Sequence, residues 1–139
     1  MATKIFVNLP VKDLQKSIEF FTKLGYSFNP QFTDENATCM IIEEGSIYAM
    51  LLIEPFFKTF IDKDIADTSK VTESIIALEM PDREGVDKIV QKAIEAGATK
   101  YRDLSDMGWM YQDSFADLDG HKWEVFWMDP NGYPQETQQ

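Results

Sequence analysis

The sequence is poor in the residues that most often build active sites. It has one cysteine and one histidine in 139 residues. A single cysteine excludes an internal disulfide and any zinc or iron–sulfur site built from several thiolates. Cys39 lies in the apolar run ATCMII, which indicates a buried thiol rather than a nucleophile. A catalytic Cys–His pair could consist only of Cys39 and His121, so this class of site is not expected.

Basic residues and long apolar runs are also scarce. Lys and Arg number 13 against 24 Asp and Glu, and the net charge of −11 repels nucleic-acid phosphates and anionic lipid surfaces. No apolar run approaches the roughly 20 residues needed to cross a bilayer. The start, MATKIFVNLP, lacks the basic end and apolar stretch of a signal peptide. We therefore expect a cytoplasmic protein without nucleic-acid or membrane partners.

Several catalytic motifs are missing as well. There is no G-x-S-x-G elbow, no glycine-rich phosphate loop and no dinucleotide fingerprint. A Ser–His–Asp triad would need His121, which follows Gly120 in an expected, solvent-facing turn. His121 and Glu124 have H-x-x-E spacing, but residues three apart in a strand point to opposite faces. The two side chains should therefore not meet.

Apolar residues make up 44% of the chain, enough for the interior of a compact domain. Two segments have the periodicity of amphipathic helices, 13–25 and 82–97. An aspartate caps each at its start and a glycine ends it. The stripes expected to pack on a sheet are Leu14, Ile18, Phe21 and Leu24 in the first helix and Val86, Ile89, Val90 and Ala93 in the second.

Runs with strand character flank both helices. They span 4–11, 26–32, 37–43 and 47–54 in the first half, and 73–80, 98–104, 109–118 and 122–128 in the second. Each half therefore has the order β-α-β-β-β. Such an internal repeat predicts an α+β fold in which two similar units pack around a shared cleft.

The two halves are joined by a linker over residues 56–72, rich in phenylalanine and charge. Its composition fits a short helix that covers a sheet edge or a subunit contact, or a mobile lid over the cleft. The tail, residues 131–139, is expected to fray.

Two motifs carry a resemblance to a known family: LPVKDLQKSIEFFTKLGY near the start and DLDGHKWEVFW near the end. With the paired modules, they resemble the vicinal oxygen chelate superfamily, which includes glyoxalase I-like lyases, extradiol dioxygenases, fosfomycin-modifying enzymes and bleomycin-binding resistance proteins. The resemblance covers nearly the whole chain. It implies a single glyoxalase-like domain over 1–139, with module one about 1–55 and module two about 73–130. The modules would form a cupped mixed sheet with helices on the outside, in a homodimer.

Metal-dependent members of that superfamily hold their ion with four side chains at equivalent places of the two modules. Counting from the motifs puts these places at Phe6, Ala49, Ile75 and Glu124. Phenylalanine, alanine and isoleucine offer no lone pair to a metal. No cofactor is therefore predicted, and Zn²⁺, Ni²⁺ or Mn²⁺ would need a non-standard site at Glu124.

Strand alternation predicts which residues face the cleft. Glu124 is the candidate catalytic residue, because a carboxylate in an apolar cleft should have a raised pKa and could act as a base or bind a cation. Alternatively, a donor such as Tyr48, Tyr111 or Asn8 satisfies it. Tyr111, at the start of a strand, could also hydrogen-bond a ligand. The expected ligand-binding residues are Phe6, Asn8, Ala49, Leu51, Ile75, Ala77, Tyr111 and Phe126.

Two functions follow from these expectations, besides a plain interaction dimer with a vestigial cleft. The first is a metal-independent binding protein for a cationic or aromatic small molecule, similar to the drug-binding members. The second is a lactoylglutathione lyase-like or related enzyme in which Glu124 is the base or a non-standard metal ligand. The missing ligand residues favour the first.

Overall fold

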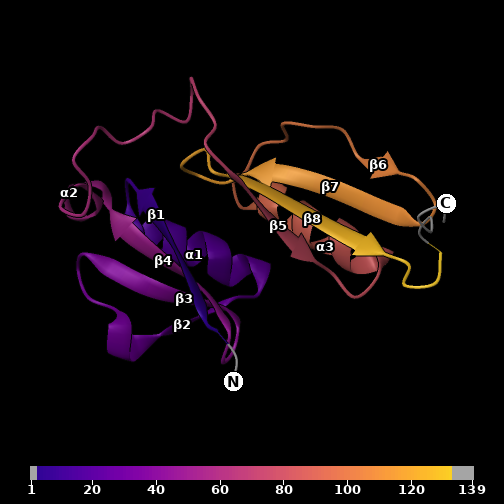
Figure 1. Cartoon of the computed structure of the whole chain (residues 1–139), viewed down its shortest axis with the longest axis horizontal. Coiled ribbons are helices and arrows are strands. Elements are labelled where there is room, and N and C mark those ends of the chain that lie inside the picture. The colour runs from indigo at the N-terminus through magenta and orange to yellow at the C-terminus, as the bar shows by residue number, and fades with distance from the viewer. Residues whose placement is uncertain (1–2, 133–139) are drawn as a thin grey trace, which may run out of the picture. The chain divides into compact units, whose positions relative to one another are not determined.

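The computed structural model describes residues 3–132, which form two β-α-β-β-β modules (Figure 1). The chain divides into Met1–Val71, called module one from here on, and Thr72–Gln139, called module two. Each module has its own four-stranded mixed sheet. The α+β fold class and the repeat are therefore confirmed. The tail expected to fray lies outside the described residues from 133 onward.

In the sheet of module one, the first strand lies next to the last strand of the module. Strand β1 pairs in parallel with β4, and β3 pairs antiparallel with both β4 and β2, giving the order β1-β4-β3-β2. Its elements are β1 (Ile5–Val11), α1 (Leu14–Leu24), β2 (Ser27–Asn29), the 3-10 helix η1 (Pro30–Phe32), β3 (Ala37–Glu43), β4 (Ile47–Ile53) and α2 (Glu54–Lys58).

Helix α1 has the expected ends but a rotated buried face. The Asp13 carboxylate accepts the Lys16 N–H at 3.1 Å, and Gly25 adopts a left-handed conformation at φ 109°. The buried residues are Ser17, Phe20, Phe21 and Leu24. The expected Leu14 and Ile18 are only half-buried. The predicted stripe contains Phe21 and Leu24 of the buried face but misses Ser17 and Phe20. Ser17 was missed because it is polar, although it is only 3% exposed.

Module two repeats the order of strands as β5-β8-β7-β6, again with one parallel pair. Asp82 caps its helix by accepting the Gly85 N–H at 2.7 Å, and the expected stripe of Val86, Ile89, Val90 and Ala93 is buried. The elements are β5 (Ile75–Glu79), α3 (Arg83–Glu95), β6 (Ser105–Asp106), β7 (Met110–Ala116) and β8 (Lys122–Met128).

One expected strand is wrong and another is shorter than predicted. Residues 98–104 make only a single bridge, between Thr99 and Ala116, before the two-residue β6. Residues 26–32 form three residues of strand and then η1, because Pro30 cannot donate a ladder hydrogen bond and Asn29 caps the turn through the Gln31 N–H. Residues 98–104 thus have strand-like composition without the pairing that makes a strand, whereas residues 27–29 do pair with β3.

The first part of the linker forms the expected short helix. Helix α2 contacts β1 and β4, and the rings of Phe56 and Phe60 meet edge to face at 5.1 Å. Whether the linker acts as a lid stays a prediction. Within residues 3–132 no helix has both the length and the apolar character to cross a bilayer.

The turn between β7 and β8 is organised by a buried carboxylate. One oxygen of Asp117 accepts the backbone N–H groups of Asp119 and His121, both at 3.0 Å. The other accepts the indole N–H of Trp123 at 2.8 Å. Burial raises the pKa of Asp117, although the charge of His121 and these hydrogen bonds act against the shift. The turn thus fixes the side chain of Trp123, which is 1% exposed.

We predict that Asp117→Ala lowers the free energy of unfolding by about 3 kcal/mol, because the buried indole N–H of Trp123 and two part-buried backbone N–H groups lose their acceptor. Asp34 is the matched control, since it accepts the Asn36 and Ala37 N–H groups in an exposed turn of module one. Asp34→Ala should cost only about 1 kcal/mol. Urea unfolding measures both, and equal losses would contradict the structural role of Asp117.

Candidate functional site

The sheet of module two has one face against α3 and one face away from it. The side of α3 is marked by Tyr111, whose hydroxyl donates to Asp87 of α3 at 2.6 Å, and by the buried Trp123 and Val125. We call the other side the open face. Strand pairing places on it the residues Ile75, Ala77, Gln112, Ser114, Glu124 and Phe126. The sequence predicted this orientation correctly for Ile75, Ala77, Glu124 and Phe126.

Glu124 forms an ion pair on the open face. Its Oε2 lies 3.1 Å from Nη1 of Arg102, and the two side chains are 19% and 50% exposed. Arg102 comes from the segment that was wrongly expected to be a strand. The partner is therefore a guanidinium, and none of the expected donors Tyr48, Tyr111 and Asn8. The carboxylate does not lie unpaired in an apolar cleft.

Two hydroxyl groups lie buried near this ion pair. They belong to Tyr101, next to Arg102 in the chain, and to Ser114, directly opposite Glu124 in the sheet. Within residues 3–132 each lies within hydrogen-bonding reach of the other and of no further group. Burial and the charge of Glu124 raise the pKa of Tyr101, while the charge of Arg102 and a hydrogen bond with the Ser114 hydroxyl act against the shift. Lys122 adds a positive charge 5.3 Å from the centre of the Tyr101 ring.

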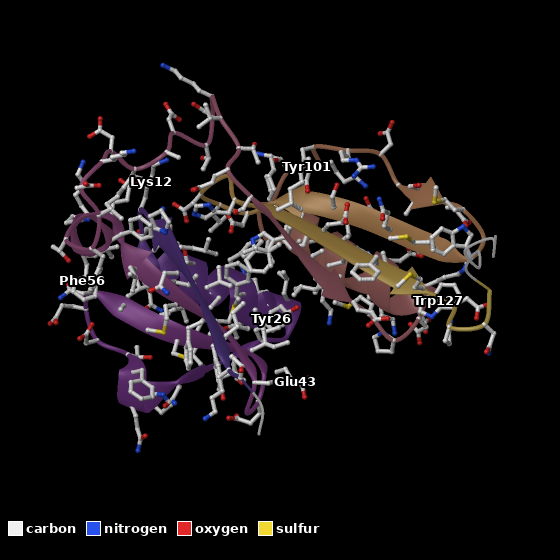
Figure 2. The ribbon with its side chains drawn as sticks, viewed as in Figure 1. Lys12, Tyr26, Glu43, Phe56, Tyr101 and Trp127 are labelled. Carbon is white, nitrogen blue, oxygen red and sulfur yellow. The ribbon has the colours of Figure 1, made fainter. Side chains whose placement is uncertain are left out.

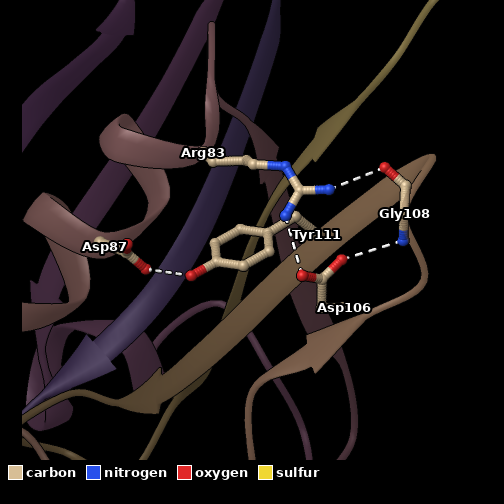
Figure 3. Close-up of polar contacts among 5 residues, drawn as sticks. All are labelled: Arg83, Asp87, Asp106, Gly108 and Tyr111. Atoms are coloured by element: carbon tan, nitrogen blue, oxygen red, sulfur yellow. Dashed lines mark hydrogen bonds and ion pairs between the residues drawn. The ribbon is translucent and has the colours of Figure 1, made fainter.

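Tyr111 does not lie on the open face. It is on the side of α3, within a polar cluster at the start of that helix (Figure 3). Arg83 lies over the Tyr111 ring at 4.9 Å and donates to Asp106 and to the Gly108 carbonyl, both at 2.8 Å. Tyr111 pairs with Trp127 and faces away from Glu124, so it is not a hydrogen-bond donor to that carboxylate, and its ligand-binding role stays a prediction. The cluster joins α3 to β6 and β7.

Module one confirms half of the orientations expected for it. Phe6 and Asn8 lie away from α1, and Phe6 stacks on Tyr48 at 4.8 Å between ring centres. Ala49 and Leu51 are on the face toward α1, where they are 0% and 1% exposed. Their predicted orientation is wrong, because β4 pairs them with Val7 and Leu9, the residues packed under the helix.

Comparison with known proteins agrees with this architecture. The family model described as "Bleomycin resistance protein-like N-terminal" matches residues 3–42. A hypothetical protein from S. aureus is 28% identical, with a TM-score of 0.75, 91% of this chain covered and 94% of that one. A glyoxalase/bleomycin resistance protein/dioxygenase family enzyme from Burkholderia phytofirmans PsJN is 16% identical (TM-score 0.74, coverage 91% and 99%). A glyoxalase/bleomycin resistance protein/dioxygenase from Nocardioides is 20% identical (TM-score 0.72, coverage 99% and 91%).

The chain therefore shares the fold of glyoxalase/bleomycin resistance protein/dioxygenase structures, and residues 3–42 resemble the N-terminal part of bleomycin resistance-like proteins. Comparison with curated proteins gives no match.

Strand pairing corrects one of the places at which metal-dependent superfamily members carry a ligand. In module two, Glu124 pairs with Ala77. Asn8 is the residue of β1 that corresponds to Ala77, and its partner in β4 is Met50. Met50 rather than Ala49 is thus the counterpart of Glu124. The sequence alignment missed this because it matched the two turns and not the register of the last strand against the first, which differs by one residue between the modules.

The residues at these four places do not fit a divalent metal. They are Phe6, Met50, Ile75 and Glu124, which supply one carboxylate and one thioether, and a thioether is a poor ligand for Zn²⁺, Ni²⁺ or Mn²⁺. In the described part of the chain, no three side chains of the types His, Cys, Asp and Glu come together as a metal site. The carboxylate that remains is bound by Arg102.

Sequence reasoning missed Arg102, Tyr101 and Ser114. Alternation along β7, combined with the tight turn before β8, contains enough information to place Ser114 beside Glu124. Arg102 and Tyr101 carry no such signal, because they reach the open face from a segment without regular structure.

We predict that Asp87→Asn lowers the pKa of Tyr111. The hydrogen bond to Asp87, burial and nearby carboxylates raise the pKa of Tyr111 to about 12. Because the folded-state pKa is raised, the contribution of Tyr111 to stability is complete below pH 10 and is lost as the pH rises through about 12. The variant removes the largest cause, so Tyr111 should ionise closer to pH 10.

Carbon-13 NMR of the tyrosine ζ-carbons measures each pKa separately. Tyr26 is the internal control, since burial alone raises the pKa of Tyr26 to about 12 and it lies in module one. A Tyr111 titration that is the same in both proteins would contradict the role of Asp87.

Proposed function

We propose that this chain is a metal-independent small-molecule binding protein of the superfamily, and that the open face of module two carries its ligand. The observation that supports this most directly is the ion pair of Glu124 with Arg102 at 3.1 Å. A guanidinium occupies the carboxylate that a metal would need. Phe6, Met50 and Ile75 then leave no replacement ligand set.

The surface chemistry of the open face supports an aromatic ligand. Ile75 is 51% exposed, Ala77 is exposed, and Phe126 is half-buried on the neighbouring strand. Flat apolar surface of this kind gains free energy when an apolar ring covers it. A cationic ligand, the other expected class, would have to displace Arg102 from Glu124. Aromatic compounds are therefore the first class to test.

The lyase alternative rests on the same carboxylate. In that function Glu124 would take a proton from the substrate, which requires an accessible oxygen within hydrogen-bond reach of the substrate. Arg102 already occupies one oxygen, so the alternative has less support. The proposal also includes that the protein is a homodimer and lies in the cytoplasm. The free, buried thiol of Cys39 agrees with the reducing conditions of that compartment.

The metal-free proposal predicts that Glu124 does not bind Zn²⁺, Ni²⁺ or Mn²⁺. Elemental analysis of the purified protein should find no stoichiometric ion, and metal titration followed by thermal unfolding should give the same result for wild type and Glu124→Gln. Glu79→Gln is the matched control, because Glu79 lies exposed on the same face opposite Phe126. A stoichiometric ion lost in Glu124→Gln and kept in Glu79→Gln would overturn the proposal.

The binding proposal also predicts stabilisation by planar aromatic compounds. A ligand at a hundredfold excess over its dissociation constant should raise the free energy of unfolding by about 2.7 kcal/mol. Ile75→Asp should abolish this gain, because it places a charge on the exposed apolar surface of the open face. If cationic drugs stabilise the protein and aromatic compounds do not, the ligand class proposed above is wrong.

A further inference from the structure

The segment that joins α3 to β7 adds no buried side chain to the core of module two. We call residues 99–108 the strap; it runs alongside β7 in Figure 1, and Tyr101, labelled in Figure 2, belongs to it. None of residues 99–108 is buried, and only Tyr101 and Ser105 are half-buried. Leu104 and Met107 are 45% and 61% exposed. Local opening is easiest where few apolar side chains are buried, so the strap can open more easily than its surroundings.

The backbone of the strap pairs with β7 only near its two ends. Thr99 forms a bridge with Ala116, and the two residues of β6 pair with Gln112 and Tyr111. One further hydrogen bond closes the turn into β7. Between the bridge and β6 the strap is two residues longer than β7, so it cannot stay in register with that strand. Backbone pairing therefore holds the strap only weakly.

Two ion pairs hold the first half of the strap from opposite sides of the sheet. Lys100 binds Asp113, which lies on the side of α3 because it alternates with Ser114 along β7. Arg102 binds Glu124 on the open face at 3.1 Å. Both cations belong to the strap and both carboxylates belong to β7 or β8. Side-chain charge thus replaces the missing backbone pairing.

A third ion pair holds the second half of the strap. Nη1 of Arg83, from α3, lies 2.8 Å from Oδ2 of Asp106, and its Nη2 donates to the Gly108 carbonyl (Figure 3). In each of the three pairs the basic side chain is at least 40% exposed. Ion pairs with this much exposure are individually weak and are screened by salt. The attachment of the strap should therefore depend on ionic strength.

One contact of the strap is buried and favours the closed state. The Tyr101 hydroxyl lies within hydrogen-bonding reach of the Ser114 hydroxyl, and Lys122 is 5.3 Å from the centre of the Tyr101 ring. The large core side chains, such as Phe115 and Trp123, are each 1% exposed and lie on β7 and β8. Opening the strap releases one half-buried ring and leaves the packing of these side chains against α3 in place.

We propose that the strap opens as a unit while α3, β5, β7 and β8 stay folded, and that its ion pairs set the balance between the closed and open states. Opening removes Arg102 from Glu124, so the open face has a paired carboxylate in one state and a free carboxylate in the other. Higher ionic strength, or a ligand that competes for one of these charges, favours the open state. This inference goes beyond the proposed function and does not depend on the ligand class.

Trypsin measures the opening directly, because it cleaves after Lys100 and Arg102 and needs a stretch of chain detached from the sheet. The cleavage rate follows the population of the open state when opening and closing are fast. Mass spectrometry gives the initial rate at each bond. Lys88 and Lys92 of α3 report unfolding of the whole module, and Lys63 in the exposed linker reports the effect of salt on trypsin itself. The strap should be cleaved at least about tenfold faster than α3.

Ionic strength provides the first test. Raising NaCl from about 0.1 M to about 1 M shortens the Debye length from about 10 Å to about 3 Å. Cleavage in the strap, corrected by the rate at Lys63, should then rise about fivefold, while cleavage in α3 stays slow. Strap cleavage no faster than that of α3 would overturn the proposal, because the strap would open only when the module unfolds. Strap cleavage without salt dependence would overturn the role of the ion pairs.

Substitution of single partners provides the second test. Glu124→Gln should raise strap cleavage about threefold at low salt, because Arg102 loses its charged partner while both trypsin sites remain. Arg83→Gln should act similarly from outside the strap, since Asp106 loses its partner. Glu79→Gln is the matched control, because Glu79 is an exposed carboxylate of the same face without an ion pair among residues 3–132. Equal rates in Glu124→Gln and Glu79→Gln would overturn the assignment of Glu124 as a residue that holds the strap.

Discussion

The parallel pairing of the last strand of each module with its first determines what each side chain can do. In module two, β8 pairs with β5 so that Trp123 and Val125 pack under α3 while Glu124 and Phe126 remain on the open face. Moving this register by one residue would bury the carboxylate and expose the tryptophan. The register of β8 against β5 therefore determines both the hydrophobic core and the candidate site.

Much of this arrangement could be predicted from sequence, because local chemistry determines it. Helix α3 follows from Asp82 at its start and an apolar stripe with helical period, and both are present as predicted. Strand β8 follows from alternation. Ala49 and Leu51 were misplaced because matching the two turns residue by residue does not give the register of β4 against β1, in which they pair with Val7 and Leu9. Met50 takes the position that alignment had given to Ala49.

The polar partners of the site lay beyond sequence reasoning for a different reason. Arg102 and Glu124 are 22 residues apart, and their contact depends on how an irregular segment crosses the sheet. The composition of that segment is typical of a strand. The segment is held to the sheet by side-chain ion pairs, however, which join Lys100 to Asp113 and Arg102 to Glu124. Neither contact has a periodic signature. The hydrogen bond of Tyr111 was missed likewise, because its partner Asp87 is on another element.

The segment from Lys100 to Arg102 is held to the sheet through side-chain ends, with one backbone bridge at Thr99. A substitution at Tyr101 or Arg102 therefore changes the polar lining of the open face without breaking a strand ladder. In the proposed function, natural variation at these positions would act on ligand choice while the fold is maintained by β5, β7 and β8. A scaffold whose recognition residues are separable from its folding residues can acquire new specificities by single mutations, which suits an architecture that carries many different functions.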